Sequence, residues 1–483
     1  MRKTLSPKKR NRSVAAVSRS VQVLALLACG ACTTVGPEYE APEVRLDPAW
    51  LDAELELYDT GPTELIDWWR TFDDPVLEKL VAAAYENSYS LEVAALRIQE
   101  SRAQLSIASG NRYPQTQVAT GGATIAGTGD DSVADSSIVQ YDLGAAIAWE
   151  LDFWGKYQHA IEAADANFFA SVADFSDLVI LLTAQVADTY FVVRSIEEQL
   201  KLARESATIQ QRSYEIADVL FRNGEDSELD ALQARTLLLS TQAVIPSLEL
   251  GLKQSKIALG VILGVTTAEV DALLGPEGGL PEIPDSVAVG VPADLLRQRP
   301  DVRAAELRAR AQNALVGVAT ANLYPSFSLN GTLGFASDDT SGSPSLFDSD
   351  AFGYSAGLSM VWPFLNYGRI KNSIRVEDVR LQQALIAYQG TVLQAAAEVE
   401  NAMASFVGTR KQDEILGEGV SAAARSAELS LLRYKEGFAD YQRVLDAQQS
   451  LFGQQQRYAA NRGNIARSLV AIYRSLGGGW QAQ

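Results

Sequence analysis

Apolar residues recur at every third or fourth position from Lys156 to Asn223, a stretch of 68 residues that contains neither Gly nor Pro. Nothing in this stretch forces the backbone out of a helix, which at ~1.5 Å rise per residue would be roughly 100 Å long. Between Phe168 and Phe221 the apolar series is interrupted by Thr189 and Gln210. Such a spacing, held over so many turns, is typical of a coiled-coil seam. One long helix packed against other helices is predicted here.

Shorter helices are predicted on either side of the long one. After a turn at residues 223–227, the chain is expected to return as a helix to about Leu263, with Pro246 marking a break or kink. Upstream, a helical region is predicted from Asp74-Pro75 to Tyr113-Pro114, where proline ends it.

Two groups of residues need a separate interpretation. Asp73 and Asp74, before the first helical region, are interpreted as solvated charges. Residues 178–193 are apolar enough to suggest a membrane helix, but Gln185 and Asp188 interrupt them. They are assigned to the core between subunits of a helical tube.

Strict alternation of apolar with polar or small residues predicts four strands. It is weak over residues 115–125, strong from Ile138 to Leu151, and clear over residues 326–335 and 352–362. Segments of about ten residues with one apolar face are typical of a transmembrane β-barrel, although a soluble β-sandwich alternates in the same way. Four strands are too few to close a barrel within one chain. The strands are therefore expected to be completed by other copies of the chain.

The same order of elements occurs twice, which indicates an internal repeat. Tyr113-Pro114 recurs 211 positions later as Tyr324-Pro325, and Gly224 recurs 213 positions later as Gly437. The first repeat is placed at residues 66–264, a Pro- and Gly-rich linker at 265–292, the second repeat at 293–477 and a short tail at 478–483. The second long helix contains Gly390, Gly408, Gly417 and Gly419 and is therefore expected to be less regular in its lower half.

The N-terminus is predicted to be a secretory signal, residues 1–28, followed by an extended Pro-rich arm, residues 29–65. Seven basic residues and no acidic one lie in the first 20 positions, before a short apolar run. The run ends at Cys29, in a string that resembles a bacterial lipobox, with Cys32 as an alternative. A diacylglycerol and an N-acyl chain such as palmitate on the first mature Cys would anchor the protein to the outer membrane.

Charge and residue usage exclude several classes of function. Beyond the first 20 residues the chain carries 34 basic and 60 acidic residues, a formal charge of −26. A surface so negative argues against binding nucleic acid. His159 is the single histidine and the two cysteines lie at the end of the N-terminal apolar run, so a metal centre or a His-based triad in the mature chain has almost nothing to be built from. The chain is not expected to be an enzyme or to hold a cofactor.

Joined together, these elements predict a mainly α protein with a small β part. Because open strand edges cannot lie in lipid, three copies would supply twelve strands for one transmembrane β-barrel. The six repeats would continue as a helical tube, or α-barrel. The predicted assembly is a homotrimeric duct through the outer membrane and across most of the periplasm.

Three strings resemble the outer membrane efflux protein family: VGPEYEAP at Val35 to Pro42, WWRTFDDPVLEKL at Trp68 to Leu80, and VGVPADLLRQRPDVRAAE at Val289 to Glu306. They are most similar to its TolC-like lipoprotein branch, which serves resistance-nodulation-division pumps. The resemblance implies a trimeric channel that binds a periplasmic membrane-fusion adaptor and an inner-membrane pump and exports drugs or other small toxic compounds. An outlet for secreted polypeptides, as in type I secretion, and a periplasmic coiled-coil protein without a pore remain as alternatives.

The resemblance also implies which residues close the duct. The position similar to the family's periplasmic gate is Asp446, where a threefold axis would bring three carboxylates together. Gln442 stands one turn earlier, where the family often has an apolar residue. The turns at Gly224 and Gly437 are expected to reverse the long helices and to form the tips that bind the adaptor.

Overall fold

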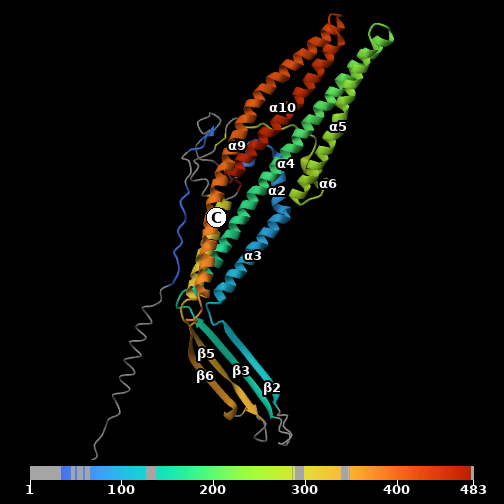
Figure 1. The fold of residues 1–483 in the computed structure, drawn as a ribbon. Coiled ribbons are helices and arrows are strands. Elements are labelled where there is room, and N and C mark those ends of the chain that lie inside the picture. The colour runs from blue at the N-terminus through green and yellow to red at the C-terminus, as the bar shows by residue number, and fades with distance from the viewer. Residues whose placement is uncertain are drawn as a thin grey trace, which may run out of the picture. The chain divides into compact units, whose positions relative to one another are not determined.

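The computed structural model describes residues 34–44, 49–51, 58–59, 66–126, 138–284, 287–288, 298–338, 346–347 and 349–479. The described chain contains one four-stranded and one two-stranded sheet. Most of it is helical, as Figure 1 shows. It divides into two compact units, each built from both halves of the sequence. The sheet unit takes its described residues from Met1–Pro42, Gln99–Ala170 and Glu306–Ala387, and the helical unit from Glu43–Ile98, Ser171–Ala305 and Tyr388–Gln483.

The sheet unit contains four antiparallel strands in the order β2-β3-β5-β6. They are β2 (Thr116–Ala126), β3 (Ile138–Leu151), β5 (Ser326–Asp338) and β6 (Phe352–Val361), with the 3-10 turn η3 (Ser349–Ala351) before β6. The predicted strands are confirmed. The two halves of the sequence meet where β3 pairs with β5, and there Ala145 lies opposite Leu333.

Two helices of 67 residues each, α4 (Lys156–Arg222) and α9 (Arg369–Lys435), begin in the sheet unit and continue in the helical unit. At ~1.5 Å per residue each is roughly 100 Å long. In the helical unit α4 returns as α5 (Glu228–Leu263), and α9 returns as α10 (Tyr441–Ser475). The helices α3 (Tyr89–Gly110) and α8 (Pro300–Ala321) precede the two strand pairs. The long helix predicted from Lys156 is therefore confirmed.

The core of the helical unit lies around the middle of α4 and α9 and the C-terminal third of α10. Smaller elements cover it: η1 (Trp68–Phe72), α2 (Pro75–Asn87) and α6 (Thr267–Leu274). Trp68 stacks on Tyr473 with ring centroids 5.2 Å apart, and Phe72 lies 4.7 Å from Phe191. The predicted assignment of residues 178–193 to a core between subunits is wrong for Leu182, Val186, Phe191 and Val193, because these are buried within one chain.

The region predicted as one helix after Asp74 is two helices, α2 and α3, because Ser88 adopts extended backbone between them. Asp74 itself is not a solvated charge, as predicted, but is 9% exposed. Its carboxylate caps α2 by accepting from the backbone N–H of Val76 at 2.8 Å, and it accepts a second bond from the Tyr190 hydroxyl. Pairing with α4 therefore explains its burial.

Glycine does not disturb the second long helix, contrary to the prediction. α9 is continuous through Gly390, Gly408, Gly417 and Gly419. Each glycine costs only ~1 kcal/mol relative to alanine inside a helix, which is small beside the packing of a 67-residue helix on its neighbours. α5 likewise continues through Pro246 without a break.

The N-terminal residues 34–44 have no regular secondary structure, and residues 34–42 belong to the sheet unit. The backbone N–H of Val35 donates to Trp154 O at 3.2 Å, and Asn313 Nδ2 donates to Pro37 O at 3.0 Å. In the helical unit β1 (Tyr58–Asp59) pairs in parallel with β4 (Val287–Ala288), a pairing that was not predicted. Cys29 and Cys32 lie outside the described residues.

Candidate functional site

The sheet has one apolar and one polar face, and the apolar face is not buried within the chain. On β5 and β6, Leu333 is 56% exposed, Tyr354 81% and Leu358 68%. Leu333 lies opposite Tyr354 and continues one apolar row across the strands. On the polar face Thr332 Oγ1 lies 2.7 Å from Ser355 Oγ. An exposed apolar face of this size indicates contact with lipid or with another protein.

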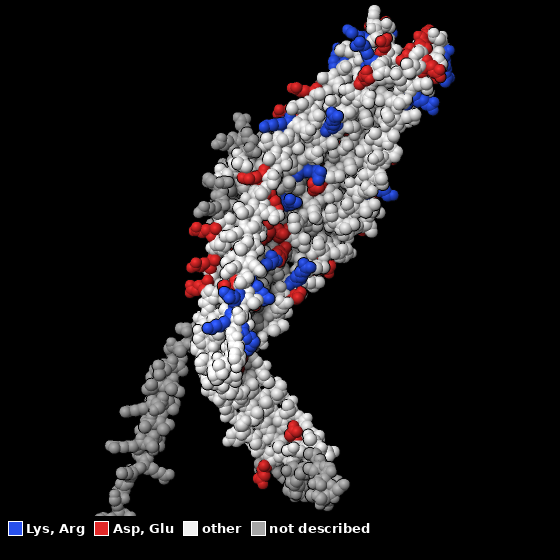
Figure 2. Space-filling view, in the orientation of Figure 1, with Lys and Arg blue, Asp and Glu red and all other residues white. Residues whose placement is uncertain are grey.

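Neither outer strand of this sheet, β2 or β6, has a further strand partner among the described residues. Their free N–H and C=O groups must be paired elsewhere if the apolar face lies in lipid, because hydrocarbon offers no hydrogen bonds. Figure 2 shows few charged side chains on the visible side of the sheet, whereas charged side chains of both signs gather at the ends of the helical hairpins. An apolar band and unpaired edges are what a segment of a shared barrel requires.

Both helical hairpins end in the same turn geometry, as the repeat predicted. Gly224 and Gly437 have φ of 76° and 78°, in the left-handed region that favours glycine. The N–H of Glu225 donates to Leu220 O and the N–H of Phe438 to Arg433 O, both at 2.9 Å. A Cβ added at either glycine would meet no atom within 4 Å, so the two turns are open to a partner. Adaptor binding at these tips stays a prediction.

A hydrogen bond joins the two hairpins near their tips. The Tyr434 hydroxyl donates to Asp226 Oδ2 at 2.5 Å, and the Tyr434 ring lies 4.8 Å from the Tyr441 ring. Burial and the nearby Asp226 carboxylate raise the pKa of Tyr434, so the hydroxyl remains a donor. Partial burial opposes ionisation of Asp226, but the hydrogen bonds from Tyr434, Asp230 and the Ser227 backbone together outweigh it and lower the pKa of Asp226. Sequence reasoning missed this pair, which lies 208 positions apart.

Asp446 and Gln442 lie one turn apart on the exposed side of α10. Gln442 Nε2 donates to Asp446 Oδ1 at 2.8 Å, so the glutamine orients the carboxylate. The opposite side of α10 is packed, because Val444 and Leu445 are buried in a small cluster with α4 and α5. The Asp446 carboxylate therefore faces away from its own chain. That position is available to a neighbouring copy, and the gate role stays a prediction.

Arg299, which precedes α8, ties three helices together in the helical unit. It is 8% exposed and pairs with Asp301 at 2.8 Å and with Glu398 of α9 at 2.9 Å. Its Nη1 donates to Ser475 O at the end of α10 at 2.6 Å. Desolvation opposes its charge, but bonds to the two carboxylates raise the pKa of Arg299. Arg299 lies in the string that carried the family resemblance, but this role was not predicted.

Asp177 of α4 lines a cavity of about 230 Å³ beside this cluster, together with Arg474. Burial, and then the Asp301 charge, raise the pKa of Asp177 to about 6, although Arg299 acts in the opposite direction. In the unfolded chain a carboxyl of this kind ionises near ~3.9. The folded state therefore binds a proton that the unfolded state has lost between these two values, and folding stability falls as pH rises through that window.

We therefore expect Asp177→Asn to remove a pH-dependent loss of stability. The wild-type free energy of unfolding should fall on the order of 1 kcal/mol between about pH 4 and pH 6.5, after allowance for solvent screening. The variant should lack this component and be the more stable at pH 7. Thermal unfolding of the purified protein across this range measures it, with Asp165→Asn, an exposed carboxylate on the same helix, as control. Equal slopes for Asp177→Asn and wild type would contradict the assignment.

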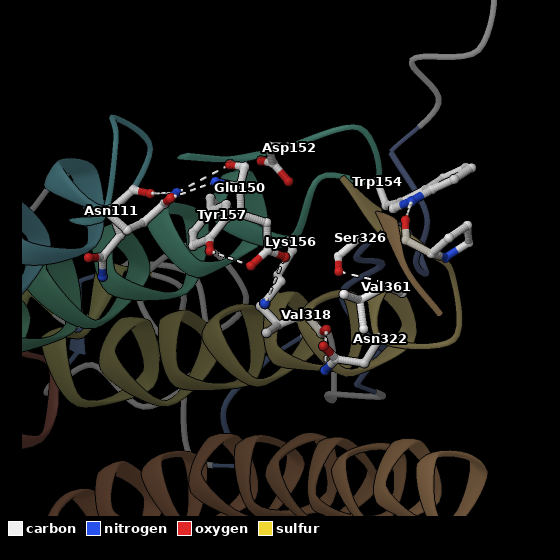
Figure 3. Close-up of polar contacts among 12 residues, drawn as sticks. Asn111, Glu150, Asp152, Trp154, Lys156, Tyr157, Val318, Asn322, Ser326 and Val361 are labelled. Atoms are coloured by element: carbon white, nitrogen blue, oxygen red, sulfur yellow. Dashed lines mark hydrogen bonds and ion pairs between the residues drawn. The ribbon is translucent and has the colours of Figure 1, made fainter. Parts of the chain in front are cut away.

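A polar network lies in the sheet unit where the strands meet the long helices (Figure 3). Glu150, near the end of β3, accepts from Lys156 Nζ at 3.2 Å and from the Tyr157 hydroxyl at 3.0 Å. Asp152 Oδ2 accepts from the backbone N–H of Gln158 at 2.8 Å, which satisfies a free donor in the first turn of α4. These bonds fix the direction in which the strand continues into the helix.

Comparison with known proteins places these features in a known family. The sequence model described as "Outer membrane efflux protein" matches residues 80–265 and 291–478. The chain is 30% identical to the pyoverdine export outer membrane protein OpmQ of Pseudomonas putida over 86% of this chain and 88% of OpmQ. It is also 30% identical to the probable outer membrane lipoprotein SilC of Salmonella typhimurium, over 95% of this chain and 98% of SilC.

A solved structure agrees with the fold. The outer-membrane channel OprN is 33% identical to this chain and superimposes with a TM-score of 0.86, covering 93% of this chain and 100% of the OprN chain.

Proposed function

Because this chain belongs to the outer membrane efflux protein family, we propose that it is the duct through which a tripartite efflux assembly releases small toxic compounds. The protein is an outer-membrane channel component that extends into the periplasm. It conducts passively, and a periplasmic adaptor and an inner-membrane resistance-nodulation-division pump deliver the cargo. The name of OpmQ as a pyoverdine export protein supports a small-molecule cargo over a polypeptide.

The open sheet is the observation that carries this proposal. Each chain offers four strands, an exposed apolar row and two edges without partners among the described residues. Three copies supply twelve strands, which suffice for a barrel with an aqueous lumen, and the joined edges leave no backbone group unpaired in lipid. The apolar row then faces lipid and the row with Thr332 faces the lumen. The long helices continue the same wall into the periplasm.

Conductance and export together test the proposal. The detergent-purified protein should have the mass of three chains and form ion-conducting pores in planar bilayers. A strain that lacks the gene should accumulate a fluorescent drug and recover on complementation. A trimer without conductance would support a structural coiled-coil protein instead. Conductance with normal drug export, but with loss of a secreted polypeptide, would support the type I secretion outlet.

At the periplasmic end we expect Asp446→Ala to raise the conductance of the closed channel several-fold. In the trimer three Asp446 carboxylates would meet at the axis, where each is oriented by Gln442 and where bound cations would offset their repulsion. Removal of the carboxylates removes the polar ring that narrows the pore. Single-channel recording in bilayers measures the change.

The matched control is Glu414→Ala, which removes an exposed carboxylate from α9. Its closed-state conductance should equal that of the wild type. If Asp446→Ala also leaves the closed-state conductance unchanged, Asp446 is a surface carboxylate and has no role in the gate.

We propose a lipid anchor on Cys29, with Cys32 as the alternative. The name of SilC as a lipoprotein supports an anchor in this family, and the contacts of Val35 with Trp154 hold the following segment against the sheet unit. A diacylglycerol and an N-acyl chain would keep this segment at the outer membrane. Mass spectrometry of the mature N-terminal peptide distinguishes the two cysteines.

A further inference from the structure

A polar cavity of about 430 Å³ lies in the sheet unit where β3, β5 and β6 meet the ends of α4, α8 and α9. This volume is within the range of ~300–1,000 Å³ that small-molecule sites occupy in proteins. Its lining includes Glu150, Ser326 and Val361, which share the polar face of the sheet with Thr332. If that face lines the lumen, as the proposed function requires, the cavity opens to the path of the cargo.

The cavity contains one acceptor without a partner. Asp152 lines it, and Asp152 Oδ1 is buried and has no hydrogen-bond partner among the described residues. The other oxygen, Oδ2, already caps α4. A buried carboxylate oxygen without a donor is costly, so a donor that enters the cavity is stabilised there. Figure 3 shows Asp152 beside the space between Glu150, Lys156, Ser326 and Val361.

The remaining charges favour a cation at this oxygen. Glu150 and Lys156 form an ion pair at 3.2 Å, which leaves Asp152 and Arg369 as the two remaining charges of the lining. Arg369 lines the cavity from the first turn of α9, and it has no ion-pair partner among the described residues. Because no carboxylate holds Arg369 in the cavity, its exposed side chain can turn toward solvent when a cation is bound.

Aromatic and apolar side chains complete the lining. Trp154 stacks on Tyr324 with ring centroids 4.6 Å apart, and its indole N–H is already used by Pro325 O at 2.8 Å. The indole thus offers a π face, which attracts organic cations, rather than a polar donor. Leu151, Pro363 and Ile370 supply apolar wall. A carboxylate, an aromatic pair and an apolar wall together suit a protonated organic amine.

We propose that this cavity binds protonated organic amines on their way through the duct, with the Asp152 carboxylate accepting a hydrogen bond from the ammonium group. The site rests on the proposed function for its place in the transport path. Its chemistry rests on the cavity alone. Binding is weak and transient, because cargo must leave as readily as it enters.

Three matched probes test the site on the detergent-purified full-length protein: benzylammonium, benzyl alcohol and benzoate. Saturation-transfer NMR titration should show that benzylammonium binds at least tenfold more tightly than the other two. Asp152→Asn should weaken the binding of benzylammonium at least tenfold. The asparagine carbonyl can still cap α4, so the fold is retained. Asp165→Asn, an exposed carboxylate in the same unit, should leave binding unchanged.

A gain-of-affinity variant guards against a folding artefact. Arg369→Gln removes the competing positive charge and should tighten the binding of benzylammonium several-fold. Crystals soaked with 4-iodobenzylammonium should show the iodine in the cavity by anomalous scattering. Equal binding of all three probes, equal affinity of Asp152→Asn and wild type, or water only in the cavity would each overturn the site.

Bilayer conductance separates this result from the proposed function. If the wild type conducts but does not bind benzylammonium, the amine site is wrong and the duct stands. If it binds benzylammonium at Asp152 but forms no pore, the site stands and the duct is wrong.

Discussion

Arg299→Met is expected to lower the stability of the helical unit by ~1–3 kcal/mol, because it leaves two half-buried carboxylates without the cation that donates to them. Arg299 is the shared cation of Asp301 and Glu398, and it also holds the last turn of α10 through Ser475 O. Methionine fills a similar volume but leaves both acids uncompensated in a cavity that Asp177 already lines. Thermal and denaturant unfolding of the purified protein would show the loss.

Arg303→Met is the matched control, because Arg303 lies one turn further along α8 and is exposed. It should change stability by less than ~0.5 kcal/mol, as surface substitutions usually do. A second variant, Arg299→Met combined with Glu398→Gln, removes one of the orphaned charges and should recover part of the loss. If Arg299→Met and Arg303→Met were equally stable, the cluster would have no structural role.

The long helices and the strands could be predicted because their signals are local. A helix of 67 residues follows from the absence of Gly and Pro after Lys156 and from the spacing of its apolar positions. A strand follows from alternation such as that of residues 138–151, which places one apolar row on one face. The internal repeat strengthened both, since each half of the sequence predicted the other.

The errors arose where long-range contacts decide the outcome. The glycines of α9 suggested irregularity, but the helices beside α9 hold it continuous. Asp74 looked like a surface charge, and only Tyr190, 116 positions away, shows why it is buried. The Arg299 cluster and the Tyr434 to Asp226 bond were missed for the same reason. A sequence without an alignment of relatives carries no signal for such pairs.

For the candidate gate, the residue was predicted from the sequence, but its role depends on contacts between chains. Position and residue type at Asp446 came from a family resemblance, and the structure adds that its carboxylate is exposed and is bonded to Gln442. Whether three such carboxylates meet depends on contacts between chains, which a single chain does not contain. The role of the apolar face of the sheet also depends on assembly with other copies. Substitution of two adjacent residues on β5 tests that role.

Leu333→Arg and Thr332→Arg place the same charge on opposite faces of β5. Both parent residues are exposed in the single chain, so packing within the chain does not distinguish them. If Leu333 faces lipid near the middle of the barrel wall, the arginine costs ~2–4 kcal/mol in each of the three chains. We therefore expect Leu333→Arg to abolish assembly of heat-resistant trimers in the outer membrane. Thr332→Arg should assemble normally, because an arginine in a water-filled lumen stays solvated.

The yield of trimers from isolated outer membranes measures assembly. Single-channel recording measures the conductance and ion selectivity of the lumen. Thr332→Arg should change conductance or ion selectivity, since Thr332 and its neighbour Ser355 would line the pore. Normal assembly of both variants would mean that the apolar row does not face lipid. If Thr332→Arg failed to form trimers while Leu333→Arg assembled normally, the two faces would be reversed. Either result would contradict the proposed barrel, because a sheet with two unpaired edges is stable in hydrocarbon only when it is closed with its apolar row outward.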